Sequence, residues 1–256
     1  MNHPSDTHPQ HQLQVCDLVK SYGKVPALKG IDLHVDAGEF VALLGPNGAG
    51  KSTLFQLLSG LFVADSGRIR IDGRDLRDDP IGALAKLGIV FQQSTLDLDL
   101  SVRRNLLFHC DMHGMQGSRA RIDSALQAMG LADNTRSAAR ALSGGNRRKV
   151  ELIRALLHEP AILLMDEATV GLDPASRSEL VRDVRALCKE QRLAVLWATH
   201  LVEEVEQADR VYILDKGTML AHGTPAEILT QTASDSLLDA FLQLTGQTRH
   251  SGEGAA

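Results

Sequence analysis

The sequence contains little cysteine, no long apolar run and no excess of positive charge. Only three cysteines occur among its 256 residues, and no two of them form a CxxC pair. This distribution excludes a disulfide framework and a zinc ribbon, and it suits a reducing cytosol. The remaining composition is that of a globular protein, with 43% hydrophobic and 23% charged residues, so wholesale disorder is excluded as well.

No segment is apolar enough to cross a membrane. The longest stretch without Asp, Glu, Lys or Arg covers 13 residues, between Lys51 and Asp65, whereas a spanning helix needs about 18 apolar residues or more. The first residues, MNHPSDTHPQHQ, contain neither the basic nor the apolar part of a secretory signal. We therefore predict a cytoplasmic protein with no direct membrane insertion, which lies peripherally on the cytoplasmic face through a partner.

The charge balance is mildly acidic. The chain has 27 Lys and Arg residues against 32 Asp and Glu residues, a formal net charge of −5. Proteins that bind nucleic acid usually show a basic excess or a basic patch. We therefore predict no nucleic-acid partner.

Apolar runs alternate with helical patterns, which is typical of an α/β fold. Residues 40–44, 162–165 and 193–198 are continuous apolar runs that predict buried strands. Residues 210–215 and 218–221 predict a hairpin around Lys216-Gly217. Two short helices are expected after Thr224-Pro225.

The middle of the chain lacks strand signals and predicts helices only. Helical patterns cover residues 102–112, 118–129 and 144–158. We therefore expect one domain over residues 13–246, with a helical subdomain over about 93–160, and disordered tails at 1–12 and 247–256. The histidines of the first tail are attributed to disorder in preference to a metal-binding tract; they are His3, His8 and His11.

One glycine-rich segment matches GxxxxGK[ST] between a predicted strand and a predicted helix. In that context backbone N–H groups and the helix N-terminus converge on phosphate oxygens. Lys51 can reach the β- and γ-phosphates, and the Ser52 hydroxyl can ligate Mg²⁺. The predicted nucleotide-binding segment is Gly45, Pro46, Asn47, Gly48, Ala49, Gly50, Lys51, Ser52 and Thr53.

A second buried strand ends in two acids. Residues 161–165 are apolar and are followed by Asp166 and Glu167. Carboxylates at the carboxyl end of such a strand face the crevice where open α/β sheets bind ligands. Asp166 is placed to hold Mg²⁺, and Glu167 is placed to polarise a water for attack on the γ-phosphorus.

The segment Leu142-Ser-Gly-Gly-Asn146 lies about 20 residues before the acidic pair. With it, the chain resembles the ATP-binding-cassette (ABC) ATPases from about Leu13 to Gly246, and the motifs occur in that family's order. The resemblance implies an α/β P-loop NTPase core of mixed sheet with flanking helices, plus an inserted all-helical subdomain. It also implies ATP hydrolysis with ATP and Mg²⁺ as cofactors.

The resemblance assigns roles to five further residues. Tyr22 matches the aromatic residue that stacks on adenine, and Val25 completes that platform. Gln92 matches the glutamine that reaches the metal, His200 matches the switch histidine, and Asp173 lies in a loop that crosses a dimer interface. The implied catalytic residues are Glu167, His200, Gln92 and Lys51, and the implied metal ligands are Ser52, Gln92 and Asp166. Taken singly, Tyr22 packed on the core, a surface Gln92 or a structural His200 would be ordinary.

The signature segment implies a second subunit. Ser143, Gly144 and Gly145 stand at a predicted helix N-terminus and can bind an anion, with Asn146 beside them. In the family, each ATP lies between one phosphate loop and the signature of the other subunit in a head-to-tail dimer. We therefore expect a second ATPase subunit, in a homodimer, and a separate transmembrane permease subunit.

Two segments are similar to the drug, polysaccharide and nodulation-factor export branch, which favours an exporter. They are Leu96–Val102 and Ser236–Gly246. Ser143–Arg148 with Val170–Arg177 is also similar to ATPases that accompany pyrroloquinoline-quinone-dependent alcohol oxidation. Two positions depart from the family pattern, Asn146 in place of the commoner glutamine and Ala168 in place of proline, and neither removes a catalytic group.

Two other classes remain as alternatives. One is a cassette ATPase that acts on nucleic acid or ribosomes, although such proteins usually carry two cassettes or basic arms. The other is a nucleotide-gated switch without turnover, against which Glu167 and His200 argue. The basic run Arg147–Lys149 is interpreted as a solvated face, and Cys110, Cys188 and Trp197 as packing residues.

Overall fold

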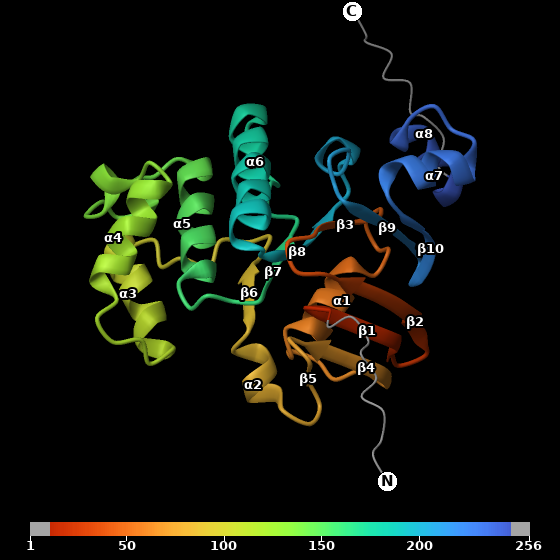
Figure 1. Ribbon diagram of the computed structural model, residues 1–256, viewed down its shortest axis with the longest axis horizontal. Helices are drawn as coiled ribbons and strands as arrows, with labels where there is room; N and C mark the ends of the chain where they lie inside the picture. The colour runs from red at the N-terminus through yellow and green to blue at the C-terminus, as the bar shows by residue number, and fades with distance from the viewer. Residues whose placement is uncertain (1–10, 247–256) are drawn as a thin grey trace, which may run out of the picture.

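The computed structural model describes residues 11–246, which form two sheets with helices between and around them (Figure 1). The ten strands within this range are β1 (Leu13–Tyr22), β2 (Val25–Val35), β3 (Phe40–Leu44), β4 (Ser66–Ile71), β5 (Arg74–Asp75), β6 (Leu87–Val90), β7 (Ile162–Asp166), β8 (Ala194–Thr199), β9 (Arg210–Asp215) and β10 (Thr218–Gly223). The eight α-helices are α1 (Lys51–Leu58), α2 (Pro80–Leu84), α3 (Val102–Met112), α4 (Arg119–Ala128), α5 (Gly144–Leu156), α6 (Pro174–Gln191), α7 (Pro225–Thr232) and α8 (Leu237–Thr245).

A six-stranded sheet carries the segments that the sequence marks for chemistry. Its order is β10-β9-β3-β8-β7-β6, with β3, β6, β7, β8 and β9 parallel and only β10 antiparallel. This confirms the predicted α/β class and the mixed sheet, and it confirms the hairpin of β9 and β10. Since β3 and β7 both lie beside β8, the phosphate loop after β3 and the acids after β7 leave the same edge of the sheet.

The second sheet is antiparallel, with the order β2-β1-β4-β5. The sequence pattern did not predict it, because β1 loses its alternation partway along. Leu13 and Val15 are buried, and so is Leu18, which has the opposite parity. The register shifts between Val15 and Leu18, where Asp17 adopts a left-handed φ of 45°. A bulge of this kind returns an apolar side chain to the inner face.

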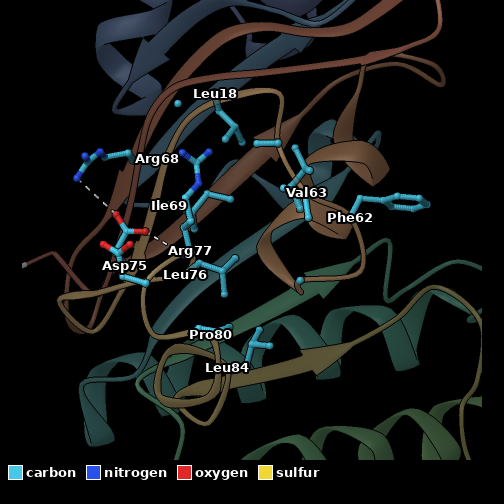
Figure 2. Close-up of a pocket in the computed structure, with 15 residues that line it drawn as sticks. Leu18, Phe62, Val63, Arg68, Ile69, Asp75, Leu76, Arg77, Pro80 and Leu84 are labelled. Carbon is cyan, nitrogen blue, oxygen red and sulfur yellow. Dashed lines mark hydrogen bonds and ion pairs between the residues drawn. The ribbon is translucent and has the colours of Figure 1, made fainter.

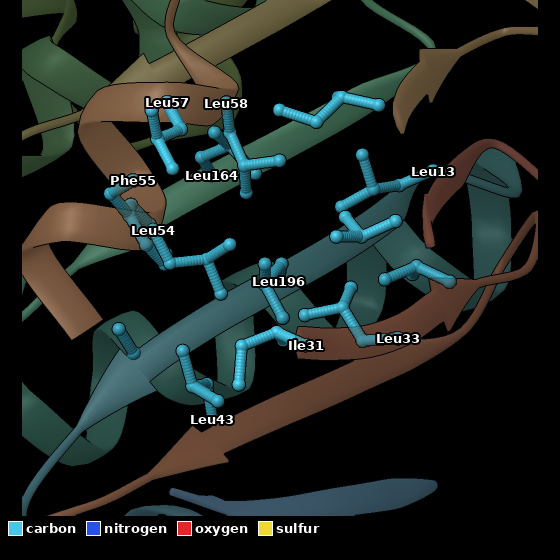
Figure 3. Packing of buried hydrophobic residues seen from close by; sticks show 14 of the residues in the cluster. Leu13, Ile31, Leu33, Leu43, Leu54, Phe55, Leu57, Leu58, Leu164 and Leu196 are labelled. Carbon is cyan, nitrogen blue, oxygen red and sulfur yellow. The ribbon is translucent and has the colours of Figure 1, made fainter. Parts of the chain in front are cut away.

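Helix α1 packs between the two sheets. Apolar side chains of α1 meet those of β1 and β2 on one side and those of β3, β7 and β8 on the other. Figure 3 shows this cluster, in which Leu13, Ile31, Leu33, Leu43, Leu54, Phe55, Leu57, Leu58, Leu164 and Leu196 are labelled. The phosphate-loop helix is thereby fixed from both faces.

The other face of the six-stranded sheet is covered by α6, α7 and α8. Leu180 and Val184 of α6 pack against Phe40 of β3 and the fully buried Trp197 of β8. Cys188 lies in the same cluster, and Cys110 is buried among the other helices. The interpretation of Trp197 and these two cysteines as packing residues is confirmed by their burial.

Helices α3, α4 and α5 form the predicted helical region between β6 and β7, at one end of the molecule in Figure 1. The only strand-like feature between Val90 and Ile162 is an isolated bridge of Ser101 with Ala138. These helices share an apolar cluster of their own, in which Leu106, Ile122 and Val150 are fully buried.

None of the helices within residues 11–246 is long and apolar enough to span a membrane. Disorder was predicted for residues 1–12 and 247–256. Of these, only residues 11 and 12 belong to the part of the chain that the structure describes.

Candidate active site

The phosphate loop has the backbone that its glycines allow. Gly48 and Gly50 adopt φ of 81° and 113°, a region that L-residues with side chains rarely occupy. A Cβ on Gly45 would stand 2.4 Å from the carbonyl oxygen of Leu214. The loop therefore needs glycine at these positions, and it delivers the chain into α1 at Lys51.

The Lys51 ammonium is buried and already has three partners. Its Nζ donates to the carbonyl oxygens of Gly45 and Pro46, at 2.6 and 3.1 Å. The same Nζ lies 3.2 Å from Oε1 of Glu167. A cation with only 4% of its surface exposed requires such partners, because isolated burial of a charge is costly.

Glu167 is the point at which the predicted catalytic residues meet. Its Oε2 lies 3.4 Å from Nε2 of Gln92 and 3.5 Å from Nδ1 of His200. The His200 nitrogen is buried and forms no hydrogen bond with any described residue. Glu167 itself is buried and adopts φ of 46°, an uncommon backbone conformation for a residue with a side chain. Lys51, Gln92, Glu167 and His200 are thus brought together.

The neighbouring acid, Asp166, is half-buried at the end of β7. Burial, with the adjacent Glu167 carboxylate, raises the pKa of Asp166 to about 6, against the opposing effect of Lys51. Two carboxylates therefore stand near one ammonium group. This surplus of negative charge fits a hard divalent cation with oxygen ligands. The other two predicted ligands, the Ser52 hydroxyl and the Gln92 amide, also offer oxygen atoms.

An open cleft of about 540 Å³ lies over the phosphate loop. It is lined by Val25, Pro26, Ala27, Lys29, Asn47, Gly48, Ala49, Gly50, Lys51, Ser52, Thr53, Glu167 and Lys216. Val25 lines the cleft, whereas Tyr22 lies outside its lining. Tyr22 is 43% exposed, donates a hydrogen bond to Oε1 of Gln56 at 3.3 Å and packs edge-on against Phe62.

The signature loop does not line this cleft. Ser143 caps α5 by accepting a hydrogen bond from the backbone N–H of Asn146 at 3.2 Å. Ser143 and Gly144 are exposed, and Gly145 is close to Ser176 of α6. The sequence-predicted anion site of Ser143, Gly144, Gly145 and Asn146 therefore contributes nothing to the cleft over the phosphate loop of the same chain.

The interpretation of Arg147–Lys149 as a solvated face is wrong for Arg148. Its guanidinium is buried and donates to the carbonyl oxygens of Phe91 and Gln92, at 2.6 and 2.8 Å. It also pairs with Glu151 at 2.7 Å. The helix that begins at the signature loop thus holds the glutamine segment directly. Arg148 precedes Leu152 by one helical turn on the buried face of α5, which is the signal that locates it.

A buried glutamate supports the segments that follow Glu167 and His200. Glu204 accepts hydrogen bonds from the Thr169 hydroxyl and, at 3.0 Å, from Nε1 of Trp197. Arg177 lies 3.8 Å from it. Nothing in the sequence pattern distinguishes Glu204 from its exposed neighbours, so this network was missed.

Asp173 has a local structural role in addition to any role across an interface. Its carboxylate accepts hydrogen bonds from the N–H of Ala175 and of Ser176 and from the Ser176 hydroxyl, and so caps α6. These bonds, that from the Ser176 hydroxyl first, hold the pKa of Asp173 below its usual range.

A second pocket, of about 340 Å³, contains none of these residues (Figure 2). It is lined mainly by apolar side chains between the end of α1, β4 and α2, among them Leu18, Val63 and Leu84. Its ion pair, Arg68 with Asp75 at 3.8 Å, lies at the edge of the view in Figure 2. The pocket is separate from the site on the phosphate loop.

The fold and the site define a P-loop ATPase. The sequence profile described as "ABC transporter" matches residues 28–170. The chain is 38% identical over 229 residues to the linearmycin resistance ATP-binding protein LnrL of Bacillus subtilis, covering 88% of this chain and 73% of that one. It is 39% identical to the daunorubicin resistance ATP-binding protein DrrA3 of Streptomyces coeruleorubidus, over 89% and 72% of the two chains.

Two further comparisons agree. The Nod factor export ATP-binding protein I of Paraburkholderia xenovorans is 34% identical over 91% of this chain and 77% of its own. A solved structure described as the ATP-binding subunit of an ABC transporter superposes with a TM-score of 0.82 at 29% identity, over 91% of this chain and 99% of that chain. The chain belongs to the ABC transporter family, and it is an ATP-binding subunit that hydrolyses ATP.

Proposed function

We propose that this chain drives export through a separate membrane-spanning polypeptide, by hydrolysing ATP between two copies of itself. The observation that carries the chemical part is the convergence of Lys51, Gln92 and His200 on the Glu167 carboxylate. Glu167 accepts a proton from the attacking water as the new bond to the γ-phosphorus forms and the bond to the leaving ADP oxygen breaks. His200 holds Glu167 and the γ-phosphate in register.

Nucleotide binding requires an exchange of partners at Lys51. Its Nζ now bonds to the carbonyl oxygens of Gly45 and Pro46 and pairs with Glu167. The β- and γ-phosphates offer stronger, charge-assisted hydrogen bonds to the same ammonium group. Release of Lys51 from Glu167 leaves that carboxylate free to accept the proton. Binding and activation of the base are thus linked through one side chain.

The donor set also fits Mg²⁺. Asp166, Ser52 and Gln92 would hold the ion, which would neutralise charge on the β- and γ-phosphate oxygens. The raised pKa of Asp166 supports this assignment. Burial and the neighbouring Glu167 disfavour the ionised form of Asp166, and a bound cation would stabilise that form.

The signature loop is the reason to propose a head-to-tail homodimer. Ser143 and Gly144 are exposed at the N-terminus of α5, where backbone N–H groups favour an anion. Because these residues do not line the cleft over the phosphate loop, they can complete a nucleotide site only in another copy. Asp173 is exposed at the start of α6, and its neighbours Leu172 and Ser176 lie close to Gly144 and Gly145 of the signature loop.

The names of similar proteins support the export direction and a membrane partner. Two of these relatives are named for resistance to linearmycin and daunorubicin, and one is named for Nod factor export. A helix of the membrane partner is proposed to dock on the segment that follows Gln92, over residues 93–104. Leu98 in this segment is 42% exposed, whereas Leu96 is buried. Mixed polar and apolar surface suits a reversible interface.

The test compares two exposed leucines in the full-length chain. Leu98→Asp is expected to leave basal ATP hydrolysis near normal and to abolish co-purification of an integral membrane protein from membranes. Leu238→Asp, at a leucine of similar exposure (44%) on α8, is the control and is expected to retain the partner. Equal recovery of the membrane protein with both variants would place the docking surface elsewhere.

A further inference from the structure

Three histidines that play no part in nucleotide chemistry face one another in the helical region. His109 lies in the last turn of α3, His113 follows the end of α3, and His158 follows the end of α5. One ring nitrogen of each lies within 4.8 Å of the others. The rings of His113 and His158 are stacked, with centroids 4.3 Å apart. The first two histidines have the i, i+4 spacing that places both side chains on one helix face.

The distance between the facing ring nitrogens of His109 and His158 is that expected of two ligands of one metal ion. Nε2 of His109 and Nδ1 of His158 are 3.4 Å apart. Two nitrogens bound at about 2.05 Å to a tetrahedral ion are about 3.3 Å apart, from the Zn–N length and the tetrahedral angle. His113 is exposed, so its side chain can rotate by the small amount needed to complete the set.

The tautomer of His158 leaves one ring nitrogen free to bind an ion on the side of His109. Nε2 of His158 lies 3.1 Å from the carbonyl oxygen of Leu87, which can only accept, so this nitrogen carries the proton. Nδ1 of His158 is then unprotonated and faces His109. A backbone carbonyl that fixes the tautomer of a ligating histidine is a usual outer contact of metal sites.

The partial burial of His109 and His158 disfavours a charged ring, which suits a metal ligand. Burial, with the charges that His113, His158 and Arg154 can carry, lowers the pKa of His109 to about 4. Burial also lowers the pKa of His158. The nearby cations are engaged elsewhere, because Arg154 donates to Thr95 and Arg121 pairs with Glu159 at 3.2 Å.

A second group of possible ligands, His11, His34 and Asp36, lacks these properties. Nε2 of His34 contacts the Arg210 guanidinium, which places a fixed positive charge against that nitrogen. His11 is engaged by the Asp36 carboxylate at 2.5 Å. This group has an internal cation where an ion would bind, and the three-histidine cluster does not.

We propose that His109, His113 and His158 form a binding site for a borderline divalent transition metal, Zn²⁺ above all, with water in the fourth position. Neutral imidazoles suit Zn²⁺, and they do not suit Mg²⁺, which prefers oxygen ligands. The ion joins the end of α3 to the end of α5 and, through the carbonyl of Leu87, to the start of β6. It therefore fastens the helical region to the sheet strand that leads to Gln92 (Figure 1).

The test measures Zn²⁺ affinity by competition with a chromophoric chelator, on the nucleotide-free, full-length chain in excess Mg²⁺. The wild-type chain is expected to bind Zn²⁺ at this site, and His113→Asn is expected to weaken that binding at least tenfold. Because His113 is exposed, its substitution should not disturb folding. His222→Asn is the matched control, since His222 is also exposed and stacks on Tyr212 outside the cluster.

Two further measurements exclude weak binding by histidines elsewhere in the chain. Co²⁺ bound to the wild-type chain and to His222→Asn should show the intense visible absorption of a four-coordinate ion, and His109→Asn should abolish it. Zn²⁺ should raise the unfolding temperature of the wild-type chain and not that of His113→Asn. Equal Zn²⁺ affinity and equal thermal shifts in the wild-type chain, His113→Asn and His109→Asn would overturn the proposal.

Discussion

The phosphate loop and the signature loop are both glycine-rich segments that lead into the N-terminus of a helix, and they use their polar groups differently. The phosphate loop carries a buried cation, Lys51, which is paired with the acid Glu167. The signature loop offers the Ser143 hydroxyl and exposed backbone, and its nearest buried cation, Arg148, is directed inward at the carbonyls of Phe91 and Gln92.

This difference separates chemistry from recognition. In the phosphate half, meaning the phosphate loop with Glu167 and His200, the Lys51 ammonium and the His200 ring each lie within 3.5 Å of the Glu167 carboxylate. At the signature half, meaning residues 143–146, the groups that can bind an anion are dipoles, namely backbone N–H groups at a helix N-terminus and the Ser143 hydroxyl. Substitutions in the phosphate half should therefore affect turnover most, and substitutions in the signature half should act through assembly of the site.

The largest effect is expected from Glu167→Gln. This change keeps the side-chain shape and removes the proton acceptor, so turnover should fall by about 10²–10⁴-fold while ATP binding persists. ATP hydrolysis and nucleotide binding are measured separately, and ATP should produce a dimer of this variant on a sizing column. Glu203→Gln, at an exposed acid, is the control. Wild-type hydrolysis in Glu167→Gln would remove Glu167 from the role of base.

Lys51→Ala and Ser143→Arg test the two halves against each other. Each charged hydrogen bond of Lys51 to a phosphate contributes about 1.5–3 kcal/mol, so the loss of even one should weaken ATP binding about tenfold to a hundredfold, and the loss of both should weaken it more. Ser143→Arg places bulk at the proposed anion site of the second copy and should stop hydrolysis with ATP binding intact. A mixture of the two variants can form one intact composite site in each dimer, and its ATPase activity is compared with that of each variant alone. Normal hydrolysis by Ser143→Arg alone would refute the head-to-tail arrangement.

Asp166→Asn tests how much the ionised Asp166 carboxylate lowers the free energy of unfolding. The pKa of Asp166 in the folded protein, about 6, lies above the ordinary value of an aspartate, 3.8. Ionisation of Asp166 therefore opposes folding, and stability is lost as the pH rises from about 4 to 6. In metal-free protein, Asp166→Asn should raise the free energy of unfolding by about 1–2 kcal/mol at pH 7, after allowance for partial solvent exposure, and by nothing attributable to charge below pH 4. Urea unfolding at both pH values measures this. A pH-independent difference would contradict it.

The smallest effect is expected from Asn146→Gln in the signature half. The side chain gains one methylene and keeps its amide, and only the backbone N–H of Asn146 takes part in the cap with Ser143. ATPase activity should rise by less than about threefold, as for a surface substitution without a structural role. A loss of activity beyond tenfold would show that this position is tightly packed in the assembled site.

Sequence patterns predicted the segments whose structure is determined by residues close together in the sequence. The run at 40–44 is apolar throughout because β3 is buried on both faces, and the glycines after it are required by backbone geometry. Apolar spacing predicted helices at 102–112 and 144–158, and the observed helices cover 102–112 and 144–156, with Ser101 and Ser143 as their N-caps. In these places the sequence alone is sufficient.

The rest depends on contacts between distant residues. The bulge at Asp17 shifts the alternation of β1, so its strand pattern could not be read without the partner strands. Arg148 and Glu204 are charged residues that are buried because they satisfy carbonyls, hydroxyls and an indole from other elements. Charge in a sequence indicates exposure on average, and only the tertiary structure identifies these exceptions.

The two hydrogen bonds from Arg148 to the carbonyls of Phe91 and Gln92 couple the N-terminus of α5 to the Gln92 segment. Helix α5 has the signature residues at its N-terminus, and one turn later its Arg148 donates hydrogen bonds to the glutamine segment. If an anion at that N-terminus favours one position of α5, it changes the free energy of the Gln92 segment by a fixed amount. By thermodynamic linkage, a partner that displaces the Gln92 segment changes the affinity of that anion by the same amount. A docked membrane protein and a nucleotide held by a second copy would then regulate each other equally in both directions.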